Sequence, residues 1–164
     1  MDPQEIFDKL KDDFIRNQIP ISNDFIINEL HYMNSVTALG KTKKEKGFYY
    51  IYFSRYAMEN EELIKKILAH ELVHTIPGCM NHGPIFHRYG NMVQAKLGIP
   101  ISTRASEEDT YQSGVARVKQ EKAKYKIECE KCGKIIYRQK KSRLVLRPEK
   151  YRCTCGGKLR LFHI

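Results

Sequence analysis

One five-residue segment, His70-Glu71-Leu72-Val73-His74, restricts this chain more than any other feature. Each residue of an α-helix turns by about 100°, so the two histidines lie about 40° apart and both imidazoles can reach one metal ion. Glu71 lies about 100° from His70 and flanks the pair, where a base can take a proton from water at the metal. The spacing therefore predicts a zinc site with His70 and His74 as ligands and Glu71 as the catalytic base.

The residues around this segment place it in a helix that faces the protein interior. Asn60 before two glutamates is a favourable start, and the Pro-Gly pair at 77–78 is a stop, so we expect a helix from residue 60 to about 76. The histidines and Glu71 share their side of this helix with leucine and isoleucine residues. Buried polar groups are costly without partners, and a metal ion would supply one. The alternative is that these residues are ordinary core or surface positions in a coincidental order.

A catalytic zinc needs a third protein ligand and an open fourth position. The segment CMNHGPIFH, residues 79–87, offers His82, His87 and Cys79. We expect His82, because it precedes a helix start on a loop that Gly83 lets approach closely. His87 lies about 140° further round if the segment is helical, and a thiolate from Cys79 would make a poorer site for activating water. The alternative for His87 and Cys79 is packing around the ligands.

Together, HELVH and the later HGPIF resemble the core of the SprT-like zinc metalloprotease family, which includes the Spartan proteases of DNA–protein crosslink repair. The resemblance implies that His82, in the HG pair, is the third ligand. It implies an α+β fold, with a zincin-like core of helices packed on a small antiparallel sheet, followed by a β-rich zinc ribbon. It also implies a metalloprotease that hydrolyses peptide bonds of DNA-associated proteins by Glu71-assisted attack of water. The interval from His74 to His82 is shorter than in several relatives, so we expect a different loop at the rim of the site.

Four cysteines near the C-terminus form two close pairs, Cys129/Cys132 and Cys153/Cys155. The 20 residues between the pairs match the spacing of a zinc ribbon, in which each pair sits on a turn. A glycine follows each pair and suits such turns. We expect all four to hold a structural zinc ion, the second Zn²⁺ of the chain, although one residue instead of two separates Cys153 from Cys155. Buried reduced thiols or a redox pair are the alternative.

Charge is divided unevenly along the chain. Residues 1–114 hold 13 Lys and Arg against 15 Asp and Glu, whereas residues 115–164 hold 16 against 4. A basic C-terminal segment predicts a polyanionic partner. Tyr125, Tyr137 and Tyr151 lie among these cations and suit stacking on unpaired bases, so we expect DNA binding through the ribbon, with single-stranded or structured DNA preferred. The alternative is a basic surface over core tyrosines.

These features predict a metalloprotease domain at residues 1–100, a linker at 101–125 and a basic zinc ribbon at 126–164. No run approaches the ~18–20 apolar residues of a membrane helix. The N-terminus lacks the basic and apolar regions of a signal peptide. We therefore expect a cytoplasmic protein without membrane contact, in which thiols stay reduced.

Outside the metal helix, the pattern predicts helices over residues 3–16 and 84–97. The aromatic run GFYYIYF, residues 47–53, is typical of a strand, and its edge is a candidate for holding an extended peptide. Residues 40–47 are typical of a charged turn. A strand around residues 31–39 would complete a hairpin across that turn.

The presence of Glu71 helps to distinguish a catalytic zinc site from the alternative functions. A non-catalytic zinc-containing DNA-binding or regulatory protein is the main alternative, but a purely structural site has no need of this carboxylate. A zinc amidase accounts poorly for the basic ribbon and the missing export signal. A deformylase-like enzyme would want a cysteine ligand before the motif, and the sequence has none there. The group that stabilises the oxyanion stays open among the tyrosines, His87 and Arg88.

Overall fold

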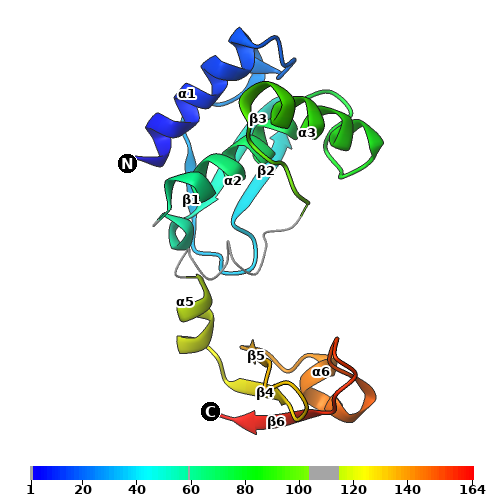
Figure 1. Ribbon diagram of the computed structural model, residues 1–164. Coiled ribbons are helices and arrows are strands. Elements are labelled where there is room, and N and C mark those ends of the chain that lie inside the picture. Colours follow the sequence, from blue (N-terminus) through cyan, green and yellow to red (C-terminus); the bar gives the residue numbers. More distant parts are fainter. Residues whose placement is uncertain (1, 59, 104–114) are drawn as a thin grey trace. The chain divides into compact units, whose positions relative to one another are not determined.

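The computed structural model describes residues 2–58, 60–103 and 115–164 (Figure 1). The chain divides into two compact units, residues 1–115 and 116–164. Within the described residues, helices and a three-stranded sheet form the N-terminal unit, and a second three-stranded sheet is the basis of the C-terminal unit. The protein is therefore a mixed α+β protein with two small sheets.

Helix α1, Pro3–Arg16, begins the N-terminal unit and confirms the helix predicted over residues 3–16. The Asp2 side chain accepts a hydrogen bond from the backbone amide of Gln4, and Pro3 occupies the first turn. The apolar face of α1 packs on α2, Glu61–Val73. Its buried hydrophobic side chains are Ile6, Phe7, Leu10 and Phe14.

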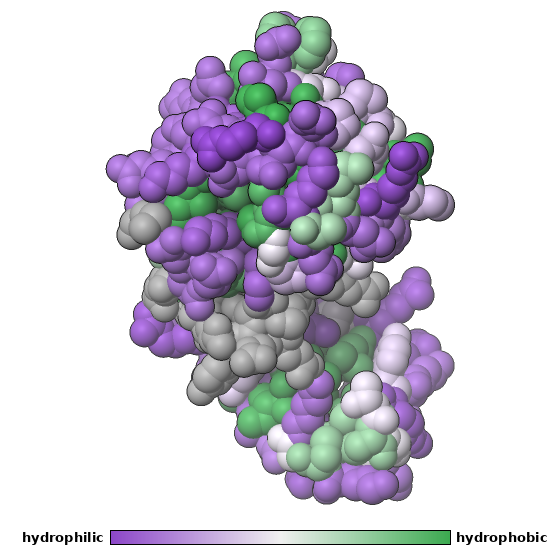
Figure 2. Space-filling view, turned by 45° about the horizontal axis from the view of Figure 1, so that its top comes forward, coloured by the Kyte–Doolittle hydropathy of each residue, from purple (hydrophilic) through white to green (hydrophobic). Residues whose placement is uncertain are grey.

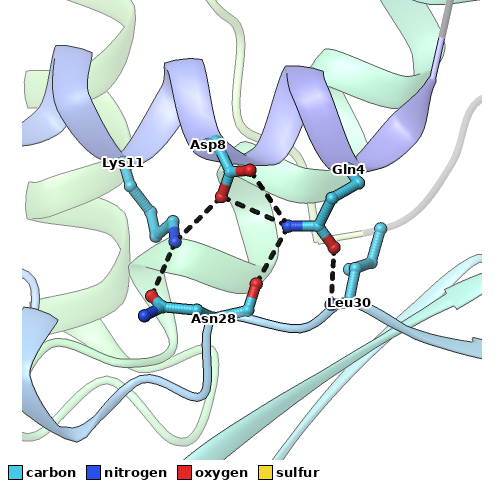
Figure 3. Close-up of polar contacts among 5 residues, drawn as sticks. All are labelled: Gln4, Asp8, Lys11, Asn28 and Leu30. Atoms are coloured by element: carbon cyan, nitrogen blue, oxygen red, sulfur yellow. Dashed lines mark hydrogen bonds and ion pairs between the residues drawn. The ribbon is translucent and has the colours of Figure 1, made fainter.

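Polar side chains of α1 hold the segment that leads into the first sheet (Figure 3). The Gln4 side-chain amide donates to the Asn28 carbonyl over 2.9 Å, and the Gln4 side-chain oxygen accepts from the Leu30 amide over 2.8 Å. Lys11 donates to the Asn28 side chain over 2.9 Å and pairs with Asp8 at 3.0 Å. These contacts fix the segment just before the sheet begins.

The sheet of the N-terminal unit contains β1 (His31–Met33), β2 (Gly40–Glu45) and β3 (Phe48–Ser54) in the order β1-β3-β2. β2 and β3 form an antiparallel hairpin, whereas β1 runs parallel to β3. The sheet is thus mixed, and the expectation of a purely antiparallel sheet is wrong. The side chains of β3 that enter the core are Tyr49, Ile51 and Phe53.

The charged turn predicted over residues 40–47 is wrong, because most of this segment is strand β2. The turn is limited to Lys46 and Gly47, where φ is +49° and +90°, the signs of a type I′ hairpin turn. A lysine-rich strand is tolerated because β2 lies at an edge of the sheet, where lysines keep contact with water. Lys43 also lies over the Tyr52 ring, with 5.1 Å between Nζ and the ring centroid.

The peptide-holding edge predicted for residues 47–53 is wrong as well. β3 is the central strand and is paired on both sides. Among the described residues, the strand with a free edge beside α2 is instead β2. The strand predicted around residues 31–39 is limited to the three residues of β1, and it joins β3 in parallel because the chain crosses over before β2.

Two helices flank the loop after the HELVH motif. α2 begins after Asn60, whose side chain accepts a hydrogen bond from the Leu63 amide, and it ends at Val73. α3, Pro84–Leu97, confirms the helix predicted over these residues and ends at Gly98, where φ is +70°. The described residues of this unit also form two short 3₁₀ helices: η1, Asn23–Phe25, and η2, Arg55–Ala57.

The C-terminal unit contains an antiparallel sheet in the order β5-β4-β6. Its core is small and includes Ile127, Cys129 and Val145. Two short helices lie between β5 and β6. The elements are α5 (Val115–Glu121), β4 (Tyr125–Cys129), β5 (Ile135–Arg138), α6 (Arg143–Leu146), η3 (Pro148–Lys150) and β6 (Leu159–His163).

The boundaries of the predicted linker, residues 101–125, stay a prediction. Residues 104–114 lie outside the described residues. On the N-terminal side, Ile99 and Ile101 pack against the core of the first unit. On the other side, the predicted linker contains helix α5.

Figure 2 shows that hydrophilic residues cover most of the described surface on the side in view, with smaller hydrophobic areas between them. Exposed large hydrophobic side chains occur in both units, such as Phe25 and Met80 in the first and Leu146 in the second. Among the helices of the described residues, none has the length and apolar character needed to cross a membrane.

Candidate metal centres

Helix α2 supplies two residues of a histidine cluster. His70 lies in its last turn, and His74 is its C-cap residue. Side chains four residues apart lie on the same face of a helix, one above the other. The Nε2 atoms of the two imidazoles are 3.1 Å apart. The end of α2 therefore brings two potential ligand atoms to one point.

His82 joins this pair from the loop between α2 and α3. Its Nε2 atom is 3.1 Å from the Nε2 atoms of both His70 and His74. Nitrogens that share a tetrahedral zinc ion at the usual Zn–N distance of about 2.0–2.1 Å lie about 3.3 Å apart. The three imidazoles thus have the spacing of a metal site, and because His82 is exposed, the cluster is accessible to solvent.

The surroundings of His70 and His74 favour the neutral imidazole, with the Nε2 lone pair of His74 facing the cluster. His74 Nδ1 donates to the Cys79 carbonyl over 2.6 Å, which leaves a lone pair on Nε2. Burial, aided by the neighbouring His74 and His82, lowers the pKa of His70 to about 4, although a backbone hydrogen bond with Ser102 opposes the shift. Burial also lowers the pKa of His74. At neutral pH these imidazoles are uncharged, the form that binds a metal ion.

Phe86, in the first turn of α3, packs against the histidine cluster. Its ring centroid lies 5.0, 4.7 and 4.8 Å from those of His70, His74 and His82. The phenyl ring is buried and only 1% exposed. A buried, rigid ring in contact with all three imidazoles restricts their rotation, so Phe86 helps to set the ligand geometry.

Glu71 is held between α2 and the edge strand β2. Its side chain is 5% exposed, and the Thr42 hydroxyl donates to Oε2 over 2.7 Å. A Cβ atom at Gly40 would come within 2.5 Å of Glu71 Oε1, so the close approach of the strand requires glycine there. Burial raises the pKa of Glu71 to about 7, and hydrogen bonds from Thr42 oppose the rise. A cation among the three histidines would oppose it further.

The other candidates from the sequence lie outside the histidine cluster. His87 is exposed, and its ring centroid is 6.0 Å from that of Phe86. Arg88 is exposed and lies beside the Tyr89 ring. Cys79 is buried and contributes its carbonyl to His74, and among the described residues its thiol is not part of a metal-capable group.

The four cysteines of the C-terminal unit form a second cluster. The sulfurs of Cys129 and Cys155 are 3.5 Å apart, and those of Cys132 and Cys153 are 3.6 Å apart. All four sulfurs lie within 4.8 Å of one another. Thiolates around a tetrahedral zinc ion, with Zn–S about 2.3 Å, lie about 3.8 Å apart. The cluster therefore fits a four-thiolate zinc site, and it includes the irregular Cys153.

Glycines shape both turns of this cluster. The Gly133 amide donates to the Cys129 carbonyl over 2.9 Å, and the Gly156 amide to the Cys153 carbonyl over 2.8 Å. φ is +69° at Gly133 and +80° at Gly156, angles that favour glycine. At Gly157, a Cβ atom would come within 2.5 Å of the Cys129 sulfur. The second glycine of the CTCGG segment thus lets the two turns meet despite the short Cys153–Cys155 spacing.

The thiols influence one another strongly. Backbone hydrogen bonds lower the pKa of Cys129 and Cys153, that of Cys153 to about 6. A backbone hydrogen bond at Lys134 acts in the same direction on Cys132, but hydrogen bonding among the sulfurs outweighs it and raises the Cys132 pKa to about 12. A bound cation would favour the thiolate form of all four.

The fold and the histidine cluster together define a mixed α+β protein with a candidate metal site at the end of its helix α2. The model of the SprT-like family matches residues 4–105, and the chain belongs to this family. The match confirms the family that HELVH and HGPIF suggest, and it points to a zinc-dependent metallopeptidase-like role. A comparison with curated proteins gave no match.

Sequence reasoning missed four contributors to the site: Thr42, Gly40, the carbonyl of Cys79 and the ring of Phe86. The first two lie in the segment interpreted as a turn. A glycine inside a strand often marks close approach by another group, so reading residues 40–45 as a strand would have drawn attention to Gly40. The Cys79 carbonyl leaves no signal in the sequence, because any residue offers one.

Proposed function

We propose that this chain is a zinc metalloprotease that hydrolyses peptide bonds, with its catalytic zinc held by His70, His74 and His82. The observation that carries the proposal is the buried carboxylate of Glu71, on the same helix as two of the converging imidazoles. A site built for structure alone needs no buried carboxylate beside its ligands, because burying one is costly. The alternative, a non-catalytic zinc-containing DNA-binding or regulatory protein, leaves Glu71 without a role.

In such a site, zinc supplies a Lewis acid that polarises a carbonyl and lowers the pKa of water. Glu71 accepts a proton from the attacking water and returns it to the leaving nitrogen of the peptide. A carboxylate whose pKa is raised by burial is suited to both transfers, because a base works best when its pKa is near the working pH. The Thr42 hydroxyl orients the carboxylate from the strand side.

The free edge of β2 is the place where a peptide substrate would bind. An extended chain can pair with the unpaired backbone groups of an edge strand. Thr42 lies on β2 and hydrogen-bonds to Glu71, so a peptide paired there would lie beside the base. This assignment replaces residues 47–53, whose strand has no free edge.

A structural zinc ion in the cysteine cluster and DNA-associated protein substrates complete the proposal. The C-terminal segment, residues 115–164, holds 16 Lys and Arg against 4 Asp and Glu, which supports binding to DNA. Of the three tyrosines expected to stack on bases, Tyr125 is 9% exposed and belongs to the core. Tyr137 is half-buried, whereas Tyr151 is 40% exposed and free to stack.

The proposal is tested with Glu71→Gln. Removing the general base should lower the rate of hydrolysis of a fluorescently labelled unstructured protein by about 10²–10⁴-fold. Elemental analysis should still find two zinc ions per chain, because Glu71 is not a ligand. Glu62→Gln changes an exposed carboxylate of the same helix and is the matched control.

Retained hydrolysis in Glu71→Gln would refute the mechanism. No hydrolysis by the zinc-loaded wild-type chain, with or without DNA, would favour the non-catalytic alternative. One zinc ion per chain, lost on Cys155→Ser and unaffected by His82→Ala, would do the same, because it would mean that the histidine cluster does not hold zinc.

A further inference from the structure

A glycine in the middle of helix α3 faces the chain segment that follows this helix. Gly90 is buried and lies inside α3, where glycine is less favourable than alanine. A Cβ atom at Gly90 would lie 3.3 Å from Ile101 Cβ and 3.4 Å from Ile101 Cγ2, which is closer than side chains ordinarily pack. The missing side chain at Gly90 therefore gives Ile101 room against the helix.

The segment after α3 turns back onto the N-terminal unit. Gly98 has φ of +70°, and its amide donates to the Gln94 carbonyl over 3.0 Å, so the helix ends there and the chain changes direction. Ile99 and Ile101 then pack, partly buried, against the core of the unit. We call residues 99–102 the return segment. Its course is fixed by packing on the core and on α3.

The return segment reaches the metal ligand His70 through the backbone of Ser102, which hydrogen-bonds to the imidazole. The Nε2 atom of His70 faces the other two imidazoles, 3.1 Å from the Nε2 atom of each. Nδ1 is thus the nitrogen left for Ser102. The bond opposes the fall in the His70 pKa, which means that the ring donates and the Ser102 carbonyl accepts.

Backbone carbonyls on either side of α3 in the sequence thus hold both histidines of α2. His74 Nδ1 donates to the Cys79 carbonyl, before α3, and His70 Nδ1 donates to the Ser102 carbonyl, after it. Both rings keep a lone pair on Nε2, the atom that faces the cluster. Partners of this kind orient metal ligands, and their loss typically weakens metal binding by about 10–100-fold.

We infer that Gly90 and Ile101 are positioning residues for the metal ligand His70. Ile101, packed against Gly90, fixes the return segment, and the return segment places the Ser102 carbonyl against Nδ1 of the ring. Two residues that are not ligands thereby set which nitrogen of His70 faces the metal. The start of the predicted linker, residues 101–125, then belongs to the metal site. The inference rests on the proposed zinc site and names residues that shape it.

The first test truncates Ile101. Zinc affinity at the histidine cluster is measured on the full chain by competition with a chelator, with zinc already in the cysteine cluster. Ile101→Ala should weaken binding by about 10–100-fold, because the Ser102 carbonyl is no longer held in place. Ile21→Ala makes the same truncation at another partly buried isoleucine on the same core and is the matched control. It should bind zinc within about twofold of wild type.

The second test fills the space at Gly90. In Gly90→Ala the added methyl group displaces Ile101, so zinc affinity should fall even though alanine favours the helix. The double variant Gly90→Ala/Ile101→Ala lacks the γ carbons of Ile101 that the methyl group would meet. It should bind zinc about as well as Ile101→Ala alone, because both substitutions act on one contact.

A spectroscopic measurement separates positioning from stability. With zinc in the cysteine cluster only, NMR of isotope-labelled histidine side chains shows which ring nitrogen carries the proton. The His70 signals are assigned with His70→Gln. The proton should lie on Nδ1 in the wild type and in Ile21→Ala, whereas Ile101→Ala and Gly90→Ala should show a mixture of both tautomers. Thermal unfolding shows that each variant is folded.

The inference is overturned if Ile101→Ala binds zinc as tightly as Ile21→Ala, or if Gly90→Ala keeps the wild-type affinity. Additive losses in the double variant, or a single His70 tautomer in every variant, would overturn it as well. The tautomer is measured without metal at the histidine cluster. A chain whose histidines hold no zinc would therefore refute the proposed function, and the NMR result alone would decide whether Ile101 and Gly90 position His70.

Discussion

The histidine cluster and the cysteine cluster can each bind a metal ion, but they lie in units with very different hydrophobic cores. The difference decides whether each unit stays folded when no metal is bound. Among the described residues, 22 buried hydrophobic residues form the core of the N-terminal unit, and five form that of the C-terminal unit. Cys129 is one of those five, and Cys153 and Cys155 pack against it. In the first unit the core positions the ligands, whereas in the second the ligands are a large part of the core.

The strongest test of this difference is removal of zinc. Structural zinc in small cysteine sites stabilises the fold by about 10–16 kcal/mol. Domains below about 40 residues usually need such support, and the C-terminal unit, residues 116–164, is only slightly longer. Chelation should therefore unfold the C-terminal unit and leave the N-terminal unit folded. Amide hydrogen exchange on the full chain measures the protection of each unit separately. Loss of protection in α1 and α2 together with β4 would contradict the comparison.

The variant Phe86→Ala tests whether packing in the core of the N-terminal unit holds the three histidines in the geometry that binds zinc. Removing this buried ring should lower the free energy of unfolding of the N-terminal unit by about 3–5 kcal/mol and weaken zinc binding at the histidine cluster. Phe14→Ala removes an equally buried ring from α1. The ring contacts of the three histidines within the described part of the chain do not include Phe14. Phe14→Ala should lower the free energy of unfolding by a similar amount but leave the zinc affinity unchanged. The zinc affinity is measured by competition with a chelator. Equal zinc affinities in the two variants would show that packing does not set the ligand geometry.

Gly40→Ala is the most local test, with the smallest expected effect on stability. The added Cβ would come within 2.5 Å of Glu71 Oε1 and 2.7 Å of Ile67 Cγ2, so the carboxylate or the strand must shift. The variant should lose about 1–3 kcal/mol of unfolding free energy, retain both zinc ions and hydrolyse protein substrate much more slowly. Lys41→Ala, on the neighbouring exposed position of β2, is the control. Normal hydrolysis in Gly40→Ala would mean that the position of Glu71 is not critical.

The helices could be predicted because their signals are local. Asp2 and Asn60 at helix starts, Gly98 at a helix end and the spacing of apolar residues give α1, α2 and α3 with small errors at the ends. His70, Glu71 and His74 occupy one such helix, so their relation to one another follows from its geometry. His82 follows from its place just before the next helix.

The sheet could not be predicted because its pairing depends on contacts between distant residues. GKTKKE has no apolar alternation, and it is a strand because it completes the edge beside β3 and α2. The contact between Gly40 and Glu71 joins residues far apart in the sequence. Inclusion of Cys153 in the cysteine cluster depends in the same way on Gly157 and its approach to Cys129.

The loop between His74 and His82 has a consequence for how a metal would bind. Thr75, Ile76 and Cys79 are at most 1% exposed, and the Cys79 carbonyl already holds the His74 ring. Packing thus anchors the loop as far as Cys79, three residues before His82, so a metal that joined His74 to His82 would have only a short exposed segment to order and little chain entropy to remove. Zinc uptake there should be fast and accompanied by a small change in heat capacity. Uptake by the cysteine cluster should resemble folding in calorimetry, with a large negative change.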